Sequence, residues 1–353
     1  MATARSFSWQ PIAVIGIVIA LTIALLILWF ASYIFLVIFA AILFAILVDG
    51  LAMLMIQWIS LPRGLARGVV IVLLLVAVAA FLTLAGPRVS SQLSQLADQL
   101  PRSIEQLSEL IKAQPWGSLL DQLNLTEHLK PSATEILADI SGVFSTAFTV
   151  IANIFVIFFI GMYLALQPDL YVRGLMHLIP KNRRERGEAV LIALGHALRW
   201  WLVGRFAAMA AVGILTTLSL ALIHTPLALV LGVIAGLFSF VPYIGPIASV
   251  VPAVLIGLTK SPLMALYVLI IYSLVLFTEG NFLTPLIQKR AVSLPPAILL
   301  SMQFAMGIFY GVIGLLLATP LAVALIVLIQ MLYVQDLLKD TVEVLGEHKR
   351  SRE

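Results

Sequence analysis

Cysteine is absent from this chain of 353 residues, and charged side chains are scarce. Without cysteine the chain can form no disulfide, no thiolate nucleophile and no cysteine metal site. Charged residues make up 11% of the sequence and hydrophobic residues 62%, whereas ordinary soluble domains are about 25% charged and about 45–50% apolar. A soluble fold has no place for so much apolar surface, so the composition predicts an integral membrane protein.

Motifs for nucleotide hydrolysis and metal catalysis are missing as well. There is no G-x-x-x-x-G-K-[ST] loop for ATP phosphates and no H-E-x-x-H helix for zinc, and the five histidines are scattered along the chain. We therefore expect no enzyme, no cofactor and no metal site. The net charge of +4 indicates basic loops beside membrane helices rather than a nucleic-acid partner.

Long stretches without Asp, Glu, Lys or Arg indicate the membrane spans, each of which needs about 20 apolar residues. These stretches are 6–48, 68–87, 140–168, 206–259, 261–278 and 291–335. The first and fourth are long enough for two spans each, with turns near residues 29–33 and 224–226. The sequence thus predicts an all-α, polytopic membrane protein with about eight transmembrane helices.

The apolar run at 297–334 is too long to cross a hydrocarbon core of about 30 Å as one straight helix. It must tilt strongly, break or fold back. The positions at which it could break are Gly307, Gly311, Gly314, Thr319 and Pro320. Broken or re-entrant segments are therefore expected in the C-terminal half.

Charge distribution divides the chain into six segments and orients them. The segments are 1–86 (three spans), 87–139 (an extramembrane amphipathic helical segment), 140–166 (the fourth span), 167–205 (a basic amphipathic segment), 206–335 (the C-terminal membrane core) and 336–353 (a polar tail). Basic loops stay in the cytoplasm. We expect a multi-pass protein of the inner membrane with both termini cytoplasmic, and an interfacial anchor at 199–205.

The segment at 87–112 has one apolar stripe, since apolar side chains recur every three or four positions from Val89 to Ile111. Pro101 predicts two shorter helices or a kink. The stripe is interpreted first as a structural helix that packs on its own chain. A neighbouring subunit and the membrane surface stay open as alternatives.

The segment 240–246 (FVPYIGP) lies in the middle of an apolar region and is followed by Pro252. Interior prolines remove helix hydrogen bonds, and unwound backbone at membrane depth must be buried in protein or line a wet cavity. Transporters use such breaks to present free backbone groups to substrates and ions. Candidate pathway residues here are Pro242, Tyr243, Gly245 and Pro246; the alternative is a surface loop between two spans.

Glu279 is the only acidic residue between Glu188 and Asp336. A carboxylate inside the bilayer is costly and by default marks an ion, proton or substrate site. Asn281 and Thr284 could share this site, with Gly280 and Pro285 opening the helix. Alternatively, Glu279 lies among the lipid headgroups near Lys289 and Arg290.

Small residues at helical spacing indicate close helix packing, which is the simpler interpretation than a functional site. They are Gly232, Gly236, Gly307, Gly311 and Gly314. Asn153, Ser301 and Gln303 are polar side chains within apolar runs. Interhelical hydrogen bonds explain them as well as a solute pathway does.

Three motifs together resemble the autoinducer-2 exporter family, also described as PerM-like permeases. The first is the segment 231–246, which is similar to the family's Pro-x-x-Gly-Pro region. The second, 279–285 (EGNFLTP), is similar to its turn that starts at Glu and ends at Pro. The third, 311–322, is similar to its Gly-x-x-Gly and Pro-Leu-Ala run. One departure is Gly204-Arg205, where the family commonly has Gly-Gln.

This resemblance implies a membrane transporter of a small solute, such as the quorum-sensing signal autoinducer-2, and a homo-oligomer for which a pentamer is plausible. Some family members are Na⁺ or Li⁺/H⁺ antiporters, so H⁺ or Na⁺ is an open choice of partner, beside membrane lipid. A third hypothesis, of another class, is a structural or regulatory membrane assembly without flux. Its warrant is the stripe at 87–112 and the basic cluster at 181–186.

Overall fold

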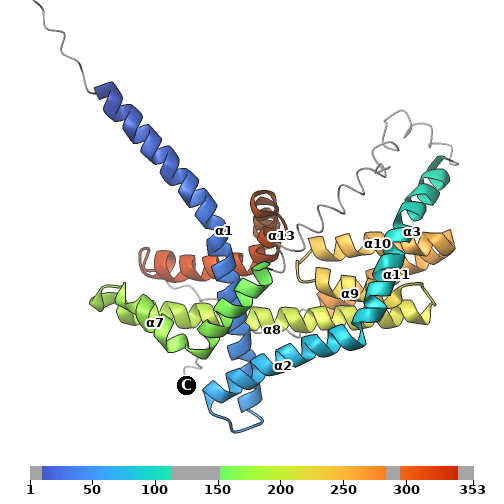
Figure 1. Ribbon diagram of the computed structural model, residues 1–353, viewed down its shortest axis with the longest axis horizontal. Coiled ribbons are helices and arrows are strands. Elements are labelled where there is room, and N and C mark those ends of the chain that lie inside the picture. Colours follow the sequence, from blue (N-terminus) through green and yellow to red (C-terminus); the bar gives the residue numbers. More distant parts are fainter. Residues whose placement is uncertain (1–9, 113–151, 284–294, 341–353) are drawn as a thin grey trace, which may run out of the picture.

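The computed structural model describes residues 10–112, 152–283 and 295–340, and every regular element in these ranges is helical (Figure 1). The elements are α1 (Gln10–Ile56), α2 (Arg63–Leu84), α3 (Gly86–Lys112), a helix at Ala152–Leu166, α7 (Pro168–His177), η1 (Lys181–Arg183), α8 (Arg184–Leu222), α9 (Ala228–Phe238), α10 (Ile244–Lys260), α11 (Pro262–Thr278), η2 (Glu279–Leu283), α13 (Pro296–Leu328) and η3 (Ile329–Gln335). The predicted all-α class is confirmed.

Several of the helices are long and apolar enough to cross a membrane. The described residues contain five such helices, and a sixth if the bent pair Ala152–Leu166 and Pro168–His177, which meet at 85°, forms one span. Helices α9 and α10 are apolar but shorter, with 11 and 17 residues. The chain is therefore a polytopic membrane protein, while the count of eight spans stays a prediction because parts of the chain lie outside these ranges.

Helix α1 is continuous over 47 residues, so the predicted turn near residues 29–33 is wrong. That turn was inferred only from the length of the apolar stretch. Between Gly16 and Gly50 the sequence contains neither glycine nor proline, so nothing interrupts the ladder of backbone hydrogen bonds. At 1.5 Å per residue the helix is about 70 Å long, well beyond the hydrocarbon thickness.

Helices α8 and α9 form an antiparallel pair, and the turn predicted near residues 224–226 is confirmed between them. His224 and Leu227 take positive φ angles of 54° and 59° to close it. The two helices pack so closely that only glycine fits at two positions of α9. A Cβ on Gly232 would fall 1.9 Å from Thr217 Oγ1, and one on Gly236 would fall 2.9 Å from the Met209 carbonyl oxygen. Helix α8 also crosses residue 205, where the sequence suggested a segment boundary.

Helix α13 consists of two limbs that meet at Gly311, one of the positions at which a break was expected. Gly311 has φ 60° and ψ −140°, outside the helical region. The limbs approach each other beside it, since a Cβ on Gly314 would lie 2.1 Å from the Met306 carbonyl oxygen. The two limbs run in different directions (Figure 1). Pro320 lies inside the second limb without ending it.

Helix α3 packs on the membrane helices of its own chain. Leu96 is buried in a cluster with residues of α8, α9, α10 and α11, and Val230 N at the start of α9 donates to Gln92 Oε1 at 3.0 Å. The helix also runs through Pro101 as one element, where the sequence predicted two helices or a kink. The part of the apolar stripe formed by Val89, Leu96 and Leu100 thus packs within the chain, as the first interpretation proposed, while Leu93 is exposed.

Helix α8 links the two main apolar clusters. One cluster combines residues of α1, α8 and α13, and the other combines residues of α3, α8, α9, α10 and α11. Figure 1 shows α8 running along much of the length of the molecule, with α1 crossing it and α9 and α10 beside its other end. Side chains in the middle of α8 therefore face both halves of the membrane domain.

Candidate functional site

The break between α9 and α10 is a tight, hydrogen-bonded turn. Val241 N donates to the Phe238 carbonyl at 3.0 Å, and Gly245 N donates to the Val241 carbonyl at 3.1 Å. Gly245 is required because a Cβ there would lie 1.7 Å from the Phe238 carbonyl oxygen. Tyr243 has φ 64° and ψ −58°, a costly conformation for a residue with a side chain. The helix interruption expected from this proline-rich stretch is present.

Arg205 of α8 lies against this turn with 4% of its surface exposed. Its Nε donates to the Phe240 carbonyl oxygen at 3.0 Å. Its Nη1 lies 3.5 Å from Glu279 Oε1, and Glu279 is 6% exposed. The turn therefore presents a free carbonyl to a buried cation, which is itself paired with a buried carboxylate.

Glu279 begins the π-helical turn η2 at the end of α11. Glu279 is distinguished from the preceding helix by its charge, because α11 contains no charged residue. Arg205 is likewise the last basic residue before Lys260. One cation and one anion, each at the border of a long charge-free stretch, thus meet at the same buried place, where each charge offsets the desolvation of the other.

Gln303 and Thr319 add an uncharged polar layer beside the turn. Gln303 is fully buried on the first limb of α13, and its Nε2 donates to the Pro242 carbonyl at 3.1 Å. The same Nε2 lies 3.4 Å from Thr319 Oγ1 on the second limb. The break of α9–α10 and the break of α13 are therefore joined by one amide side chain.

Several buried polar atoms here have no hydrogen-bond partner within the described ranges. They are Arg205 Nη2, Ser239 Oγ and Gln303 Oε1. Ser239 and Gln303 are both fully buried. Buried polar groups in native proteins are nearly always paired with protein or with ordered water. A guanidinium donor, a hydroxyl and an amide acceptor around one turn can bind a small hydroxylated molecule or water.

The remaining candidate residues lie around this cluster rather than in it. Tyr243 is 46% exposed. Asn281 is exposed, and its Nδ2 donates back to the Phe277 carbonyl at 2.9 Å. Pro242 and Pro246 are partly buried at the two ends of the turn. Thr284 and Pro285 lie outside the described residues.

Sequence reasoning did not assign four members of the cluster to it. Arg205 was assigned to an interfacial anchor, which is wrong because the side chain is buried. A signal existed, since Arg205 stands at the edge of a stretch of 54 residues without charge, from 206 to 259. Gln303 was left between a packing role and a pathway role, and Thr319 was considered only as a break point. Ser239 had no signal of its own.

These features define a class: a polytopic α-helical membrane protein with unwound backbone and a charged pair buried among its helices, as in membrane transporters. Comparison with known proteins agrees. The profile described as AI-2E family transporter matches residues 17–333. The chain belongs to this family, which confirms the resemblance found in the sequence and makes the protein a membrane transporter.

Several transport proteins of other organisms are similar to parts of the chain. It is 26% identical over 275 residues to the putative transport protein YueF of Bacillus subtilis, covering 74% of each chain. It is 32% identical over 162 residues to the putative transport protein YrrI of the same organism, covering 46% of each. It is 23% identical over 303 residues to the AI-2 transport protein TqsA of Escherichia coli, covering 83% of this chain and 85% of that protein.

Proposed function

We propose that this protein exports a small polar solute, such as the furanosyl signal autoinducer-2, across the inner membrane. The observation that carries the proposal is the buried pair of Arg205 and Glu279 against the free Phe240 carbonyl. Support for this solute comes from the family and from TqsA, which is named as an AI-2 transport protein. A sugar-like molecule carries several hydroxyl groups, each able to donate and accept.

Recognition would use the polar groups around the broken helices. Solute hydroxyls would accept from Arg205 Nη2 and donate to Gln303 Oε1, the two orphaned atoms of opposite type. Glu279 would accept a further hydroxyl, or carry a proton during the cycle. Because the ion pair is long, at 3.5 Å, the direct hydrogen bond between the partners is weak and a solute can compete for both.

Opening of the pathway would require the helices that hold these groups to separate. The turn at 239–243 and the two limbs of α13 provide breaks at which helix segments can rotate against each other. In the described structure the polar cluster is closed, with its charged members nearly inaccessible. We take this as an occluded state between inward and outward access.

An antiporter for Na⁺ or Li⁺ fits the site less well. A cation would need several oxygen ligands, and within the described ranges no group of three or more acidic or histidine side chains exists. It would also have to displace the Arg205 guanidinium from Glu279. An open cluster of carboxylates would favour an antiporter, and the described residues contain none.

The two features that suggested a structural or regulatory membrane assembly without flux support it less once their contacts are known. The α3 stripe packs on its own chain at Val89, Leu96 and Leu100, while Leu93 is 45% exposed. In the basic cluster, Arg184 Nε donates to the Ile179 carbonyl, and Arg186 pairs with Asp336 at 3.0 Å. Both features therefore serve packing within the chain and leave less surface for a partner.

The proposal also includes a membrane topology and a homo-oligomeric assembly. By the positive-inside rule, the basic residues of α7 to α8 and those at the start of α2 are assigned to the cytoplasmic side. Because α1 is one continuous helix, a single crossing places the N-terminus on the opposite side, which replaces the cytoplasmic N-terminus expected from eight spans. Cysteines introduced singly at positions 120 and 185 test this, since the chain has no other cysteine. An impermeant thiol reagent should label position 120 from outside and position 185 only after lysis. Cross-linking in membranes tests the proposed homo-oligomer.

The flux experiment uses proteoliposomes loaded with autoinducer-2, with and without a pH gradient. Wild-type protein should release the solute, and Glu279→Gln should abolish release without loss of membrane insertion. The matched control is Asp336→Asn, which removes a carboxylate paired with Arg186 directly after η3. Release by Glu279→Gln at the wild-type rate would refute the role of this site, and Na⁺-driven proton movement without solute release would favour the antiporter.

A further inference from the structure

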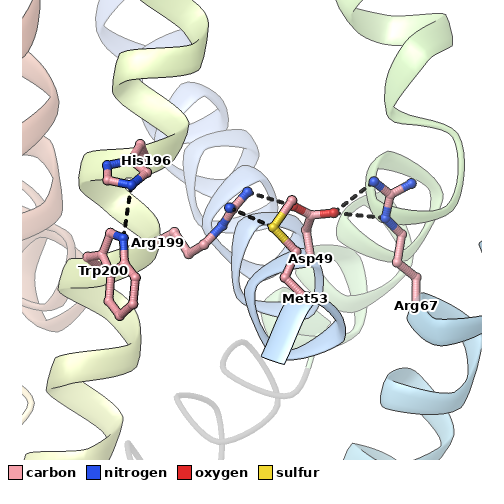
Figure 2. A network of polar contacts seen from close by, with 6 residues as sticks. All are labelled: Asp49, Met53, Arg67, His196, Arg199 and Trp200. Carbon is pink, nitrogen blue, oxygen red and sulfur yellow. Dashed lines mark hydrogen bonds and ion pairs between the residues drawn. The ribbon is translucent and has the colours of Figure 1, made fainter. Parts of the chain in front are cut away.

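Asp49 lies between two arginines from different helices, well away in the chain from the cluster at Glu279 (Figure 2). Arg67 of α2 reaches Asp49 Oδ1 with Nη2 at 2.7 Å and Nε at 2.9 Å. Arg199 of α8 reaches Asp49 Oδ2 with Nη2 at 2.6 Å. Two guanidinium groups thus share one carboxylate, and the cluster carries one uncompensated positive charge.

Arg199 has hydrogen-bonding capacity that the protein does not use. Its Nη1 lies 3.0 Å from Met53 Sδ, a weak acceptor. Its Nε is buried and has no partner among the described residues. The stem of the side chain packs against Gly50, where a Cβ would fall 2.8 Å from Arg199 Cγ. The guanidinium is therefore held in place but only partly satisfied, which is the state of a group that awaits an anionic acceptor.

A cavity of about 310 Å³ opens beside this cluster. Its charged lining residues are Asp49, Arg67 and Arg199, and the rest of the lining is almost wholly apolar: Ile42, Ala45, Ile46, Leu164, Ala165, Pro168, Tyr171, Val172, Leu175 and Leu191. Tyr171 and Leu175 of α7 are each 45% exposed, so the cavity reaches the surface of the molecule. Its volume is at the lower end of the range for ligand pockets, about 300–1,000 Å³.

The cluster lies close to one surface of the membrane. Asp49 is about two turns before the end of α1, and Arg67 is about one turn after the start of α2. A six-residue connection, 57–62, joins these two apolar helices. Short connections between spans lie at the headgroup level, so the two arginines lie where phosphodiester groups are found.

We propose that this cavity binds an anionic phospholipid. The phosphodiester oxygens would accept from the free donors of Arg199 and from Arg67, while the upper part of one acyl chain would fill the apolar cavity. The apolar lining argues against a free anion such as inorganic phosphate, which would leave those walls unused. The site shares no lining residue with the Arg205–Glu279 cluster, so it is separate from the proposed solute pathway.

Lipid competition on unmodified protein tests this directly. The full chain is purified in detergent and examined by native mass spectrometry with phosphatidylglycerol and phosphatidylcholine of identical acyl chains. We expect about tenfold tighter retention of phosphatidylglycerol, because both lipids share the phosphodiester but phosphatidylcholine adds a positive ammonium group, which the excess positive charge of the cluster repels. Inorganic phosphate in excess should not displace it. Equal retention of both lipids, or displacement by phosphate, overturns the proposal.

Variants place the binding at this cavity. Arg199→Gln should lower the preference for phosphatidylglycerol about tenfold, whereas Arg186→Gln, which removes the same charge from a pair with Asp336, should leave it unchanged. Because Arg199→Gln also weakens the hold on Asp49, a second variant leaves the charges intact. Leu175→Trp should fill the cavity and reduce lipid retention, while Leu178→Trp, at a residue that is 82% exposed and outside the lining, should not. Equal losses in variant and control overturn the assignment.

Discussion

Gln303 and Thr319 are sixteen residues apart on α13, yet the amide nitrogen of one lies 3.4 Å from the hydroxyl oxygen of the other. A straight helix would separate these positions by about 24 Å along its axis. The contact exists because the helix folds back at Gly311. The same amide nitrogen reaches the Pro242 carbonyl, so the fold of α13 also supports the turn between α9 and α10.

The first prediction concerns this fold-back. Gly311→Ala should destabilise the protein by about 1–3 kcal/mol, because φ 60° with ψ −140° is a backbone conformation that residues with a Cβ avoid. No atom lies within 4 Å of the new Cβ, so the cost is conformational strain and not a clash. Thermal unfolding in detergent measures it. Gly307→Ala is the control, since its Cβ would make only an ordinary contact, 3.9 Å from Leu315 Cδ1.

The second prediction concerns the buried ion pair. Arg205→Gln and Glu279→Gln should each destabilise the protein strongly, on the order of 3–5 kcal/mol, because each leaves one buried charge unpaired. The double variant should lose much less than the sum, since it removes both charges. Unfolding of the four proteins gives the coupling. Additive losses would show that the two side chains do not interact across the 3.5 Å in the structure.

The third prediction concerns the contact of α8 and α9. Gly232→Ala should destabilise the pair by about 1–3 kcal/mol, because its Cβ would fall 1.9 Å from Thr217 Oγ1 and 2.8 Å from the Gly213 carbonyl oxygen. The backbone neighbour cannot rotate away as a side chain can. Gly68→Ala on α2 meets nothing within 4 Å and should be neutral in the same unfolding assay. A neutral Gly232→Ala would contradict the close approach of the helices.

The fourth prediction concerns the link from α3 to the membrane domain. Gln92→Ala should cost about 0.5–2 kcal/mol, because the Val230 N–H at the first turn of α9 loses its acceptor. The loss should appear as faster amide exchange or proteolysis of α3. Gln95→Ala, at an exposed position one turn along the same helix, should not change either measurement. Equal behaviour of the two variants would argue against docking through Gln92.

Much of the fold could be predicted because it depends on local composition. Apolar stretches of 20 residues or more identify membrane helices, and Gly311 marked a break that the structure confirms. The turn at 224–226 was predictable because His224, Thr225 and Pro226 follow one another between apolar runs. The turn near 29–33 was predicted from length alone, without a residue that ends a helix, and it is the one that proved wrong.

The candidate site was predictable only in part. Glu279 and the prolines around Tyr243 stand out in an apolar chain because lipid penalises charge and unpaired backbone. The partner of Glu279 could not be found in the same way, because Arg205 follows a basic segment and resembles its neighbours in sequence. Only the packing of α8 shows that Arg205 turns toward the α9–α10 turn, while Arg199 turns toward Asp49 of α1.

The amino-acid sequence by itself determined that the chain is helical, lies in the membrane and breaks its helices at certain glycines and prolines, since these properties follow from hydropathy and backbone chemistry within short segments. Tertiary structure alone decided which polar side chains meet. Arg205, Glu279 and Gln303 come from three separate helices. Their approach depends on how helix surfaces pack, a long-range property that no local pattern records.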